Sequence, residues 1–202
     1  ILITALTGIT QLTVENRFID YFKPETEIYQ GMSLIDAALG GTTPLDIIID
    51  APASHLEPEE DEEVFDDDDI PEDLDFDMSE LEGVEEEQGI TSTSYWFNAY
   101  QLKQVAQIHH YLDEIPQTGK VLSLSSTIEM LRIVDEQVAS DNFLLALVHK
   151  QLSPELKAQL LSPYLSEDGN QLRFSIRIFE SDKNLQRQAL LEKIKTELAE
   201  KF

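Results

Sequence analysis

The densest group of side chains able to bind a small molecule is an aromatic cluster, Tyr95, Trp96, Phe97 and Tyr100. Aromatic rings line pockets for lipid-like and amphiphilic ligands. The same cluster at the start of a helix is also typical of a hydrophobic core. We therefore favour the core as the interpretation of these four residues and keep contact with a ligand as the alternative.

Serine and glycine patterns do not indicate catalysis. Ser123, Ser125 and Ser126 lack the glycines of a Gly-x-Ser-x-Gly nucleophile elbow, and no glycine-rich phosphate loop is present. We accordingly predict no catalytic residue, no cofactor and no enzymatic activity. A hydrolase whose site is assembled from distant residues stays open as a rival.

The four histidines do not have the spacing of metal ligands. His109 and His110 are adjacent, so on a helix their side chains diverge by about 100° and cannot chelate one ion as an i, i+4 pair would. His55 and His149 add no ligand spacing. The chain also has no cysteine, which excludes thiolate zinc sites and disulfides.

One acidic stretch partly matches a calcium-binding loop. Alternating carboxylates in 73–77 resemble the start of an EF-hand loop, but Met78 stands where the loop needs glycine, and Val84 stands where it needs a bidentate glutamate. We predict no dedicated metal site.

The net charge of −26 is concentrated in one segment. Residues 57–87 hold 19 of the 40 acidic residues and no basic one, which leaves 21 acidic against 14 basic residues elsewhere. We expect this insert to be disordered, because charge repulsion outweighs its apolar content. Nucleic acid is disfavoured as a partner. A rival function is an interaction module whose acidic arm, with Phe65, Leu74 and Phe76, binds a basic protein.

The first part of the chain reads as strand, helix, strand. Leu12 and Val14 alternate with polar residues, which indicates a half-buried strand. Thr26 is placed to cap a helix that Gly40-Gly41 ends. Residues 45–49 read as a buried strand. The apolar residues of the helix, expected along one face, are Ile28, Met32, Ile35 and Leu39.

The pattern then repeats after the insert. A short strand is expected within 90–97, an amphipathic helix follows, and 120–124 reads as a strand. This order matches the ferredoxin-like split β-α-β arrangement, so we predict an α+β fold. The apolar stripe of the second helix is Leu102, Val105, Ile108, Leu112 and Ile115.

The last part predicts short helices followed by a strand and a helix. We expect helices from near Ser126, after Asp141 and after Ser153. Residues 171–179 alternate as a strand, and Asp168-Gly169 favours a hairpin with 163–165. The final helix is predicted over 184–201. The segments predicted from the sequence are thus 1–56, 57–89, 90–124 and 125–202.

Two segments resemble a known family. The residues 16–24 (NRFIDYFKP) and 39–47 (LGGTTPLDI) are similar to an extracytoplasmic loop domain of resistance-nodulation-division (RND) exporters, in the branch of the mycobacterial membrane protein large transporters and hopanoid exporters. Segments 112–124, 165–169 and 172–178 fit the same order, in which Ser123-Leu124-Ser125 leads from a strand into a helix cap.

The resemblance implies a porter-type domain on the periplasmic face of a bacterial inner membrane. It would guide hydrophobic or amphiphilic cargo, with the membrane helices and a second loop domain of the same transporter as partners. Proton-relaying residues of that superfamily lie in membrane helices. No apolar run here approaches the roughly 20 residues that span a bilayer, and we expect the chain, which begins with Ile1, to be a soluble piece of that transporter.

Overall fold

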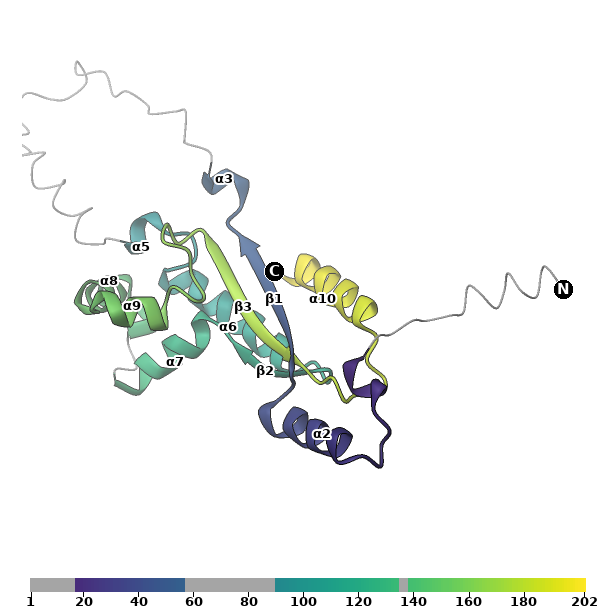
Figure 1. Cartoon of the computed structure of the whole chain (residues 1–202). Coiled ribbons are helices and arrows are strands. Elements are labelled where there is room, and N and C mark those ends of the chain that lie inside the picture. The colour runs from purple at the N-terminus through teal and green to yellow at the C-terminus, as the bar shows by residue number, and fades with distance from the viewer. Residues whose placement is uncertain (1–16, 57–89, 135–137) are drawn as a thin grey trace, which may run out of the picture. The chain divides into compact units, whose positions relative to one another are not determined.

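The computed structural model describes residues 17–56, 90–134 and 138–202. In these residues the fold is mixed, with helices and an antiparallel three-stranded sheet (Figure 1), and an α+β class is compatible with it. The predicted strand around Leu12 and Val14 and the acidic insert, with its partial calcium-loop match, lie outside the described residues.

The sheet has the strand order β1-β3-β2. β1 spans Thr43–Asp50, β2 spans Thr118–Leu122 and β3 spans Gln171–Ile178. β3 alternates as predicted, because successive side chains of a strand point to opposite faces of the sheet, and here one face is buried. Its buried residues, each at most 4% exposed, are Leu172, Phe174, Ile176 and Ile178.

The chain divides into two compact units. Of the described residues, unit 1 contains 17–45, 112–120 and 176–202, and unit 2 contains 46–56, 90–111, 121–134 and 138–175. Each unit therefore gathers stretches that are far apart in the sequence.

Unit 1 contains the 3₁₀ helix η1 (Phe18–Tyr21), the helix α2 (Glu27–Leu39) and the helix α10 (Arg187–Lys201). η1 contacts α2. Thr26 Oγ1 accepts a hydrogen bond from the Tyr29 N–H, and Gly40 ends α2 with φ +68°. Both ends of α2 were thus predicted correctly.

The predicted apolar face of α2 is not a core face. Ile28, Ile35 and Leu39 are each more than half exposed, and Asp36 is the buried residue of the helix. The spacing was correct as a helical pattern, but periodicity cannot show what covers a helix face.

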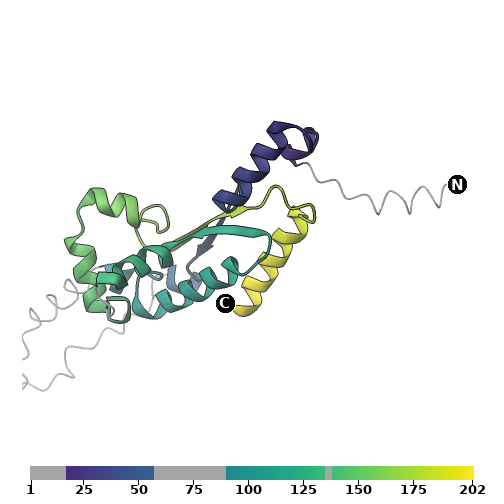
Figure 2. The ribbon, with the colours of Figure 1, turned by 90° about the horizontal axis from the view of Figure 1, so that it is seen from below.

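Unit 2 contains most of α6 (Ala99–Asp113) and the short helices α3 (Ala53–Leu56), α5 (Ile90–Thr93), α7 (Leu124–Val134), α8 (Asn142–Gln151) and α9 (Pro154–Leu160), with a 3₁₀ turn η3 at Val138–Ser140. Figures 1 and 2 both show α7, α8 and α9 grouped together. Asp141 accepts from the Phe143 N–H at 2.8 Å to cap α8, and Ser153 caps α9. These two caps were predicted correctly.

The stripe predicted for α6 is confirmed. Leu102, Val105, Ile108 and Leu112 on this helix are all at most 5% exposed, and so is Ile115, two residues after its end. An apolar stripe at helical spacing is the strongest local signal for such a helix.

The hairpin before β3 is also confirmed. Leu165 and Leu172 form an antiparallel bridge, and Gly169 between them has φ +71°. A left-handed backbone conformation is nearly free of cost for glycine, so the Asp168-Gly169 signal marked this turn correctly.

The strand predicted within 90–97 is wrong. Residues Ile90–Thr93 form α5, and the chain then bends. The buried hydroxyl of Ser94 explains the bend, because it donates to the Gly169 carbonyl and accepts from the Phe97 N–H, both at 2.9 Å. These local bonds replace a strand ladder.

Three element boundaries also differ from the prediction. β1 extends over Thr43–Asp50 and alternates between half-buried and exposed residues, with Ile48 61% exposed, because β1 is an outer strand of the described sheet. β2 lies two residues earlier than predicted, since Leu124 begins α7. The final helix starts at Arg187 rather than at 184.

Candidate functional site

A pocket of about 430 Å³ lies within unit 1. It is built by η1, the second half of α2, the start of β1 and residues on either side of the beginning of α10. Pockets that bind small molecules commonly have volumes of 300–1,000 Å³. The lining residues are Phe18, Ile19, Met32, Ile35, Asp36, Thr42, Thr43, Glu180 and Arg187.

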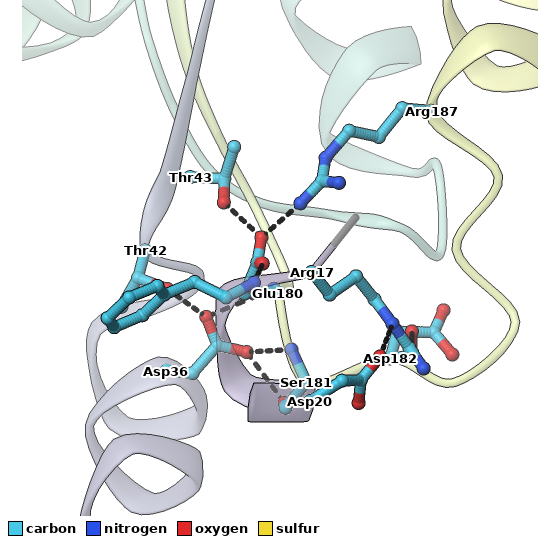
Figure 3. A network of polar contacts seen from close by, with 10 residues as sticks. Arg17, Asp20, Asp36, Thr42, Thr43, Glu180, Ser181, Asp182 and Arg187 are labelled. Atoms are coloured by element: carbon cyan, nitrogen blue, oxygen red, sulfur yellow. Dashed lines mark hydrogen bonds and ion pairs between the residues drawn. The ribbon is translucent and has the colours of Figure 1, made fainter. Parts of the chain in front are cut away.

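Asp36 is a buried carboxylate in the wall of this pocket, 1% exposed. Its Oδ2 accepts hydrogen bonds from the Ser181 N–H at 2.9 Å and from the Ser181 hydroxyl at 2.6 Å. Its Oδ1 accepts from the Thr42 hydroxyl at 2.6 Å and from the Glu180 N–H at 3.2 Å. Figure 3 shows Asp36 pointing at Ser181 from α2. Four donors thus compensate the burial of one negative charge.

Glu180 is the second buried carboxylate, 7% exposed. Its Oε1 accepts from the Phe18 N–H at 2.8 Å, and its Oε2 accepts from the Thr43 hydroxyl and the Arg187 guanidinium. In Figure 3 its carboxylate lies between Thr43 and Arg187. Glu180 therefore joins η1, the start of β1 and α10 in one network.

Both carboxylates are held in the charged form. Burial raises the pKa of Asp36, but hydrogen bonds from Ser181 and Thr42 outweigh it, and the pKa falls below its ordinary value. Burial likewise raises the pKa of Glu180, and hydrogen bonds from Thr43 and Arg187 bring it below the ordinary value. Hydrogen bonding to the ionised form is what favours it.

Arg17 attaches η1 to the same region. Its guanidinium donates to the Asp182 carbonyl at 2.6 Å and pairs with Asp20 at 2.7 Å. The segment 180–182 is thereby tied to the η1 region at two points, by the Glu180 side chain, which accepts from the Phe18 N–H, and by the Asp182 carbonyl, which accepts from Arg17.

Gly40 and Gly41, both with positive φ, allow the chain to turn from the end of α2 into this site. Gly41 has φ +92°, and a Cβ at this position would lie 2.7 Å from the Ile178 carbonyl oxygen. The Gly41 N–H donates to the Asp36 carbonyl at 2.8 Å. This close turn places the hydroxyls of Thr42 and Thr43 beside the two carboxylates.

The arrangement is suited to binding rather than to acid–base chemistry. A general base needs a pKa near the working pH, whereas the pKa values of both carboxylates lie below the ordinary ones, and the Asp36 carboxylate already accepts four hydrogen bonds. At the mouth of the pocket, Phe18 and Ile35 are 61% and 51% exposed. The pocket thus combines an apolar entrance with a polar, charged interior.

The predicted aromatic cluster lies in unit 2 and does not line this pocket. Trp96 and Phe97 are 4% and 2% exposed, whereas Tyr100 is 78% exposed. Tyr95 packs edge-on against Trp96, with ring centroids 4.9 Å apart. The structure therefore places Trp96 and Phe97 in the core and leaves Tyr100 on the surface.

A serine–histidine contact in unit 2 was not foreseen from the sequence. His109 Nδ1 and Ser123 Oγ are 2.8 Å apart. Ser123 is fully buried, and its Oγ accepts from the Ser125 N–H at 3.1 Å at the start of α7. A nucleophile needs access to its substrate, so this geometry favours a helix cap.

Metal ligands do not converge in the described part of the chain. In residues 17–56, 90–134 and 138–202, no three histidine, aspartate or glutamate side chains are grouped so as to hold an ion. The His55 ring instead packs at a tilt against Tyr95, and the His149 ring against Phe97, with ring centroids 5.2 and 5.6 Å apart.

Sequence reasoning missed Asp36 and Glu180 as site residues. One available signal was Asp36 itself, a carboxylate between Met32 and Leu39 on the helix face predicted to be apolar. The partner positions 180 and 181 could not be inferred, because about 145 residues separate them from Asp36.

Comparisons of the chain with protein-family models, with curated proteins and with solved structures gave no match. Among the described residues, no helix has both the length and the apolar character needed to cross a membrane.

Proposed function

We propose that this chain is an extracytoplasmic porter-type domain of an RND exporter, on the periplasmic face of a bacterial inner membrane, with a ferredoxin-like core. It forms part of the path along which hydrophobic or amphiphilic cargo leaves the membrane. In this proposal the domain has no turnover of its own, and its partners are the membrane helices and the second loop domain of the same transporter.

One observation carries the proposal. Two of the segments that resemble RND exporters, 16–24 and 39–47, both contribute described residues to the lining of the pocket of unit 1. Phe18 and Ile19 come from the first segment, and Thr42 and Thr43 come from the second. Four of the nine residues that line this cavity of ligand size thus come from segments that support the family resemblance.

Exposed apolar side chains around this pocket support the same function. Tyr21 on η1 and Leu34 on α2 are 70% and 69% exposed, beside the exposed Phe18 and Ile35. Groups of exposed apolar residues mark sites that contact ligands, membranes or other proteins. A domain that receives cargo and faces other transporter domains needs such a surface.

The location can be tested by cysteine labelling, because the chain itself has no cysteine. Ile133 is 87% exposed on α7, and Ile133→Cys in the product of the complete gene, with cysteines elsewhere replaced by serine, gives one reactive thiol. A membrane-impermeant maleimide should label it in cells with a permeabilised outer membrane and an intact inner membrane. Labelling only after the inner membrane is broken would contradict the proposal.

A buried position in the same unit provides the matched control. Val105 is fully buried, so Val105→Cys should react only after denaturation, which shows that labelling reports exposure in a folded domain. The complete gene supplies a second test, because an exporter requires membrane-spanning helices before residue 1 and after residue 202.

A further inference from the structure

We propose that the pocket of unit 1 binds amphiphiles whose head group is neutral or cationic and carries N–H or O–H donors, and that it discriminates against anionic head groups. This inference rests on the proposed function for the general nature of the cargo. To the proposed function it adds two points: which part of the domain contacts the cargo, and which class of head group binds there.

The apolar half of the pocket suits a hydrocarbon chain. Phe18 from η1 and Met32 and Ile35 from α2 line it, and Phe18 and Ile35 are largely exposed at its mouth. Covering this apolar surface with a ligand chain removes it from water, which is favourable by about 25 cal/mol per Å².

The polar half of the pocket suits a hydrogen-bond donor. Among the described residues, Oε1 of Glu180 accepts one bond, from the Phe18 N–H, whereas a carboxylate oxygen can accept two. Glu180 is fixed by Thr43 and Arg187, so this acceptor is held in place. A hydroxyl or ammonium group of a ligand could complete its coordination.

The charges of the lining residues oppose an anion. The lining contains two carboxylates, Asp36 and Glu180, and one guanidinium, Arg187, so its formal charge is −1. The lowered pKa values of both acids keep this charge at neutral pH. A carboxylate head group would lie beside like charges, which we expect to weaken binding about fivefold.

Methionine methyl NMR can locate such binding in the full chain. The three methionines are Met32, Met78 and Met130. Met32 lines the pocket, while Met130 lies on α7 in unit 2 and is 57% exposed. The ¹³C-methyl signals, assigned by Met→Leu variants, therefore separate pocket binding from binding elsewhere.

The probes share a 12-carbon chain and differ in the head group: glycerol monolaurate, dodecylamine and laurate, each below its critical micelle concentration and in 0.15 M salt. Salt limits the long-range effect of the acidic segment on charged probes. Butylamine, which has the ammonium group without the long hydrocarbon chain, is the control for binding by charge attraction alone. We expect glycerol monolaurate and dodecylamine to shift the Met32 signal saturably and about fivefold more tightly than laurate, with Met130 and the butylamine spectra unchanged.

Neighbouring residues on α2 supply matched variants. Ile35→Ser should weaken binding about fivefold because the pocket loses apolar contact, whereas Leu34→Ser, at a neighbouring exposed position that does not line the pocket, should leave binding unchanged. Glu180→Gln, if circular dichroism shows it folded, should remove the preference against laurate.

Equal or tighter binding of laurate would overturn the head-group inference. A Met32 signal that no probe moves, or equal effects of Ile35→Ser and Leu34→Ser, would overturn the site. Neither result bears on the location of the domain, which the cysteine labelling tests separately.

Discussion

The carboxylate of Asp36 accepts both the backbone N–H and the hydroxyl of Ser181, at 2.9 and 2.6 Å, across 145 residues of the sequence. This pair ties α2 to the segment between β3 and α10. Because Asp36 is 1% exposed, its charge is tolerated only while these donors are in place.

Asp36→Asn should therefore lower the free energy of unfolding by about 3 kcal/mol, because the amide nitrogen cannot accept the bonds that one carboxylate oxygen accepts. Asp20→Asn, in the same unit, removes an ion pair whose Asp20 side chain is 48% exposed and should cost less than about 1 kcal/mol. Urea unfolding of both variants measures the difference. Equal losses would show that the Asp36 network does not stabilise the fold.

The stability supplied by Asp36 should depend on pH. Its pKa in the folded chain lies below the ordinary value of 3.8, so the folded state favours the ionised form. This contribution is fully present above the ordinary pKa and is lost as pH falls through the folded pKa. The difference in Tm between the natural chain and Asp36→Asn should thus be large at pH 7 and shrink below about pH 4, when followed by circular dichroism. A difference that does not change with pH would refute the assignment.

Gly119 makes a closer backbone contact than any other amino acid would allow. A Cβ at this position would lie 2.0 Å from the Gly40 carbonyl oxygen. Gly119→Ala should force the backbones apart and cost at least about 2 kcal/mol. Gly31→Ala is the control with the opposite sign: Gly31 lies inside α2 with open space around it, and alanine there should stabilise by about 0.5–1 kcal/mol. Thermal unfolding distinguishes the two, and a gain for Gly119→Ala would contradict the close contact.

Two neighbouring positions on α6, Ile108 and Gln107, should differ in how well they tolerate a charged side chain. Ile108 is 1% exposed, so Ile108→Asp would bury an unpaired carboxylate and should cost several kcal/mol, on the order of 3–5. Gln107 is exposed, and Gln107→Asp should cost less than about 1 kcal/mol. Chemical denaturation of both variants measures this, and similar losses would mean that the helix face is wrongly assigned.

Local signals in the sequence were enough for the helices and strands that carry the core. The stripe of α6, the alternation of β3 and the caps at Thr26, Asp141 and Ser153 all depend on residues within a few positions of one another. Hydrogen-bonding side chains and apolar spacing act over one or two turns, so these features were readable from the sequence alone.

Tertiary structure alone decided the candidate site. Asp36 and Glu180 are 144 residues apart in the sequence. Ser94, at the bend that replaces the strand predicted within 90–97, is hydrogen-bonded to Gly169. The apolar residues of α2 show the converse, because correct helical spacing left open whether anything covers them. Periodicity records which residues share a face, whereas the partner of that face depends on how distant segments pack, and no local pattern encodes that pairing.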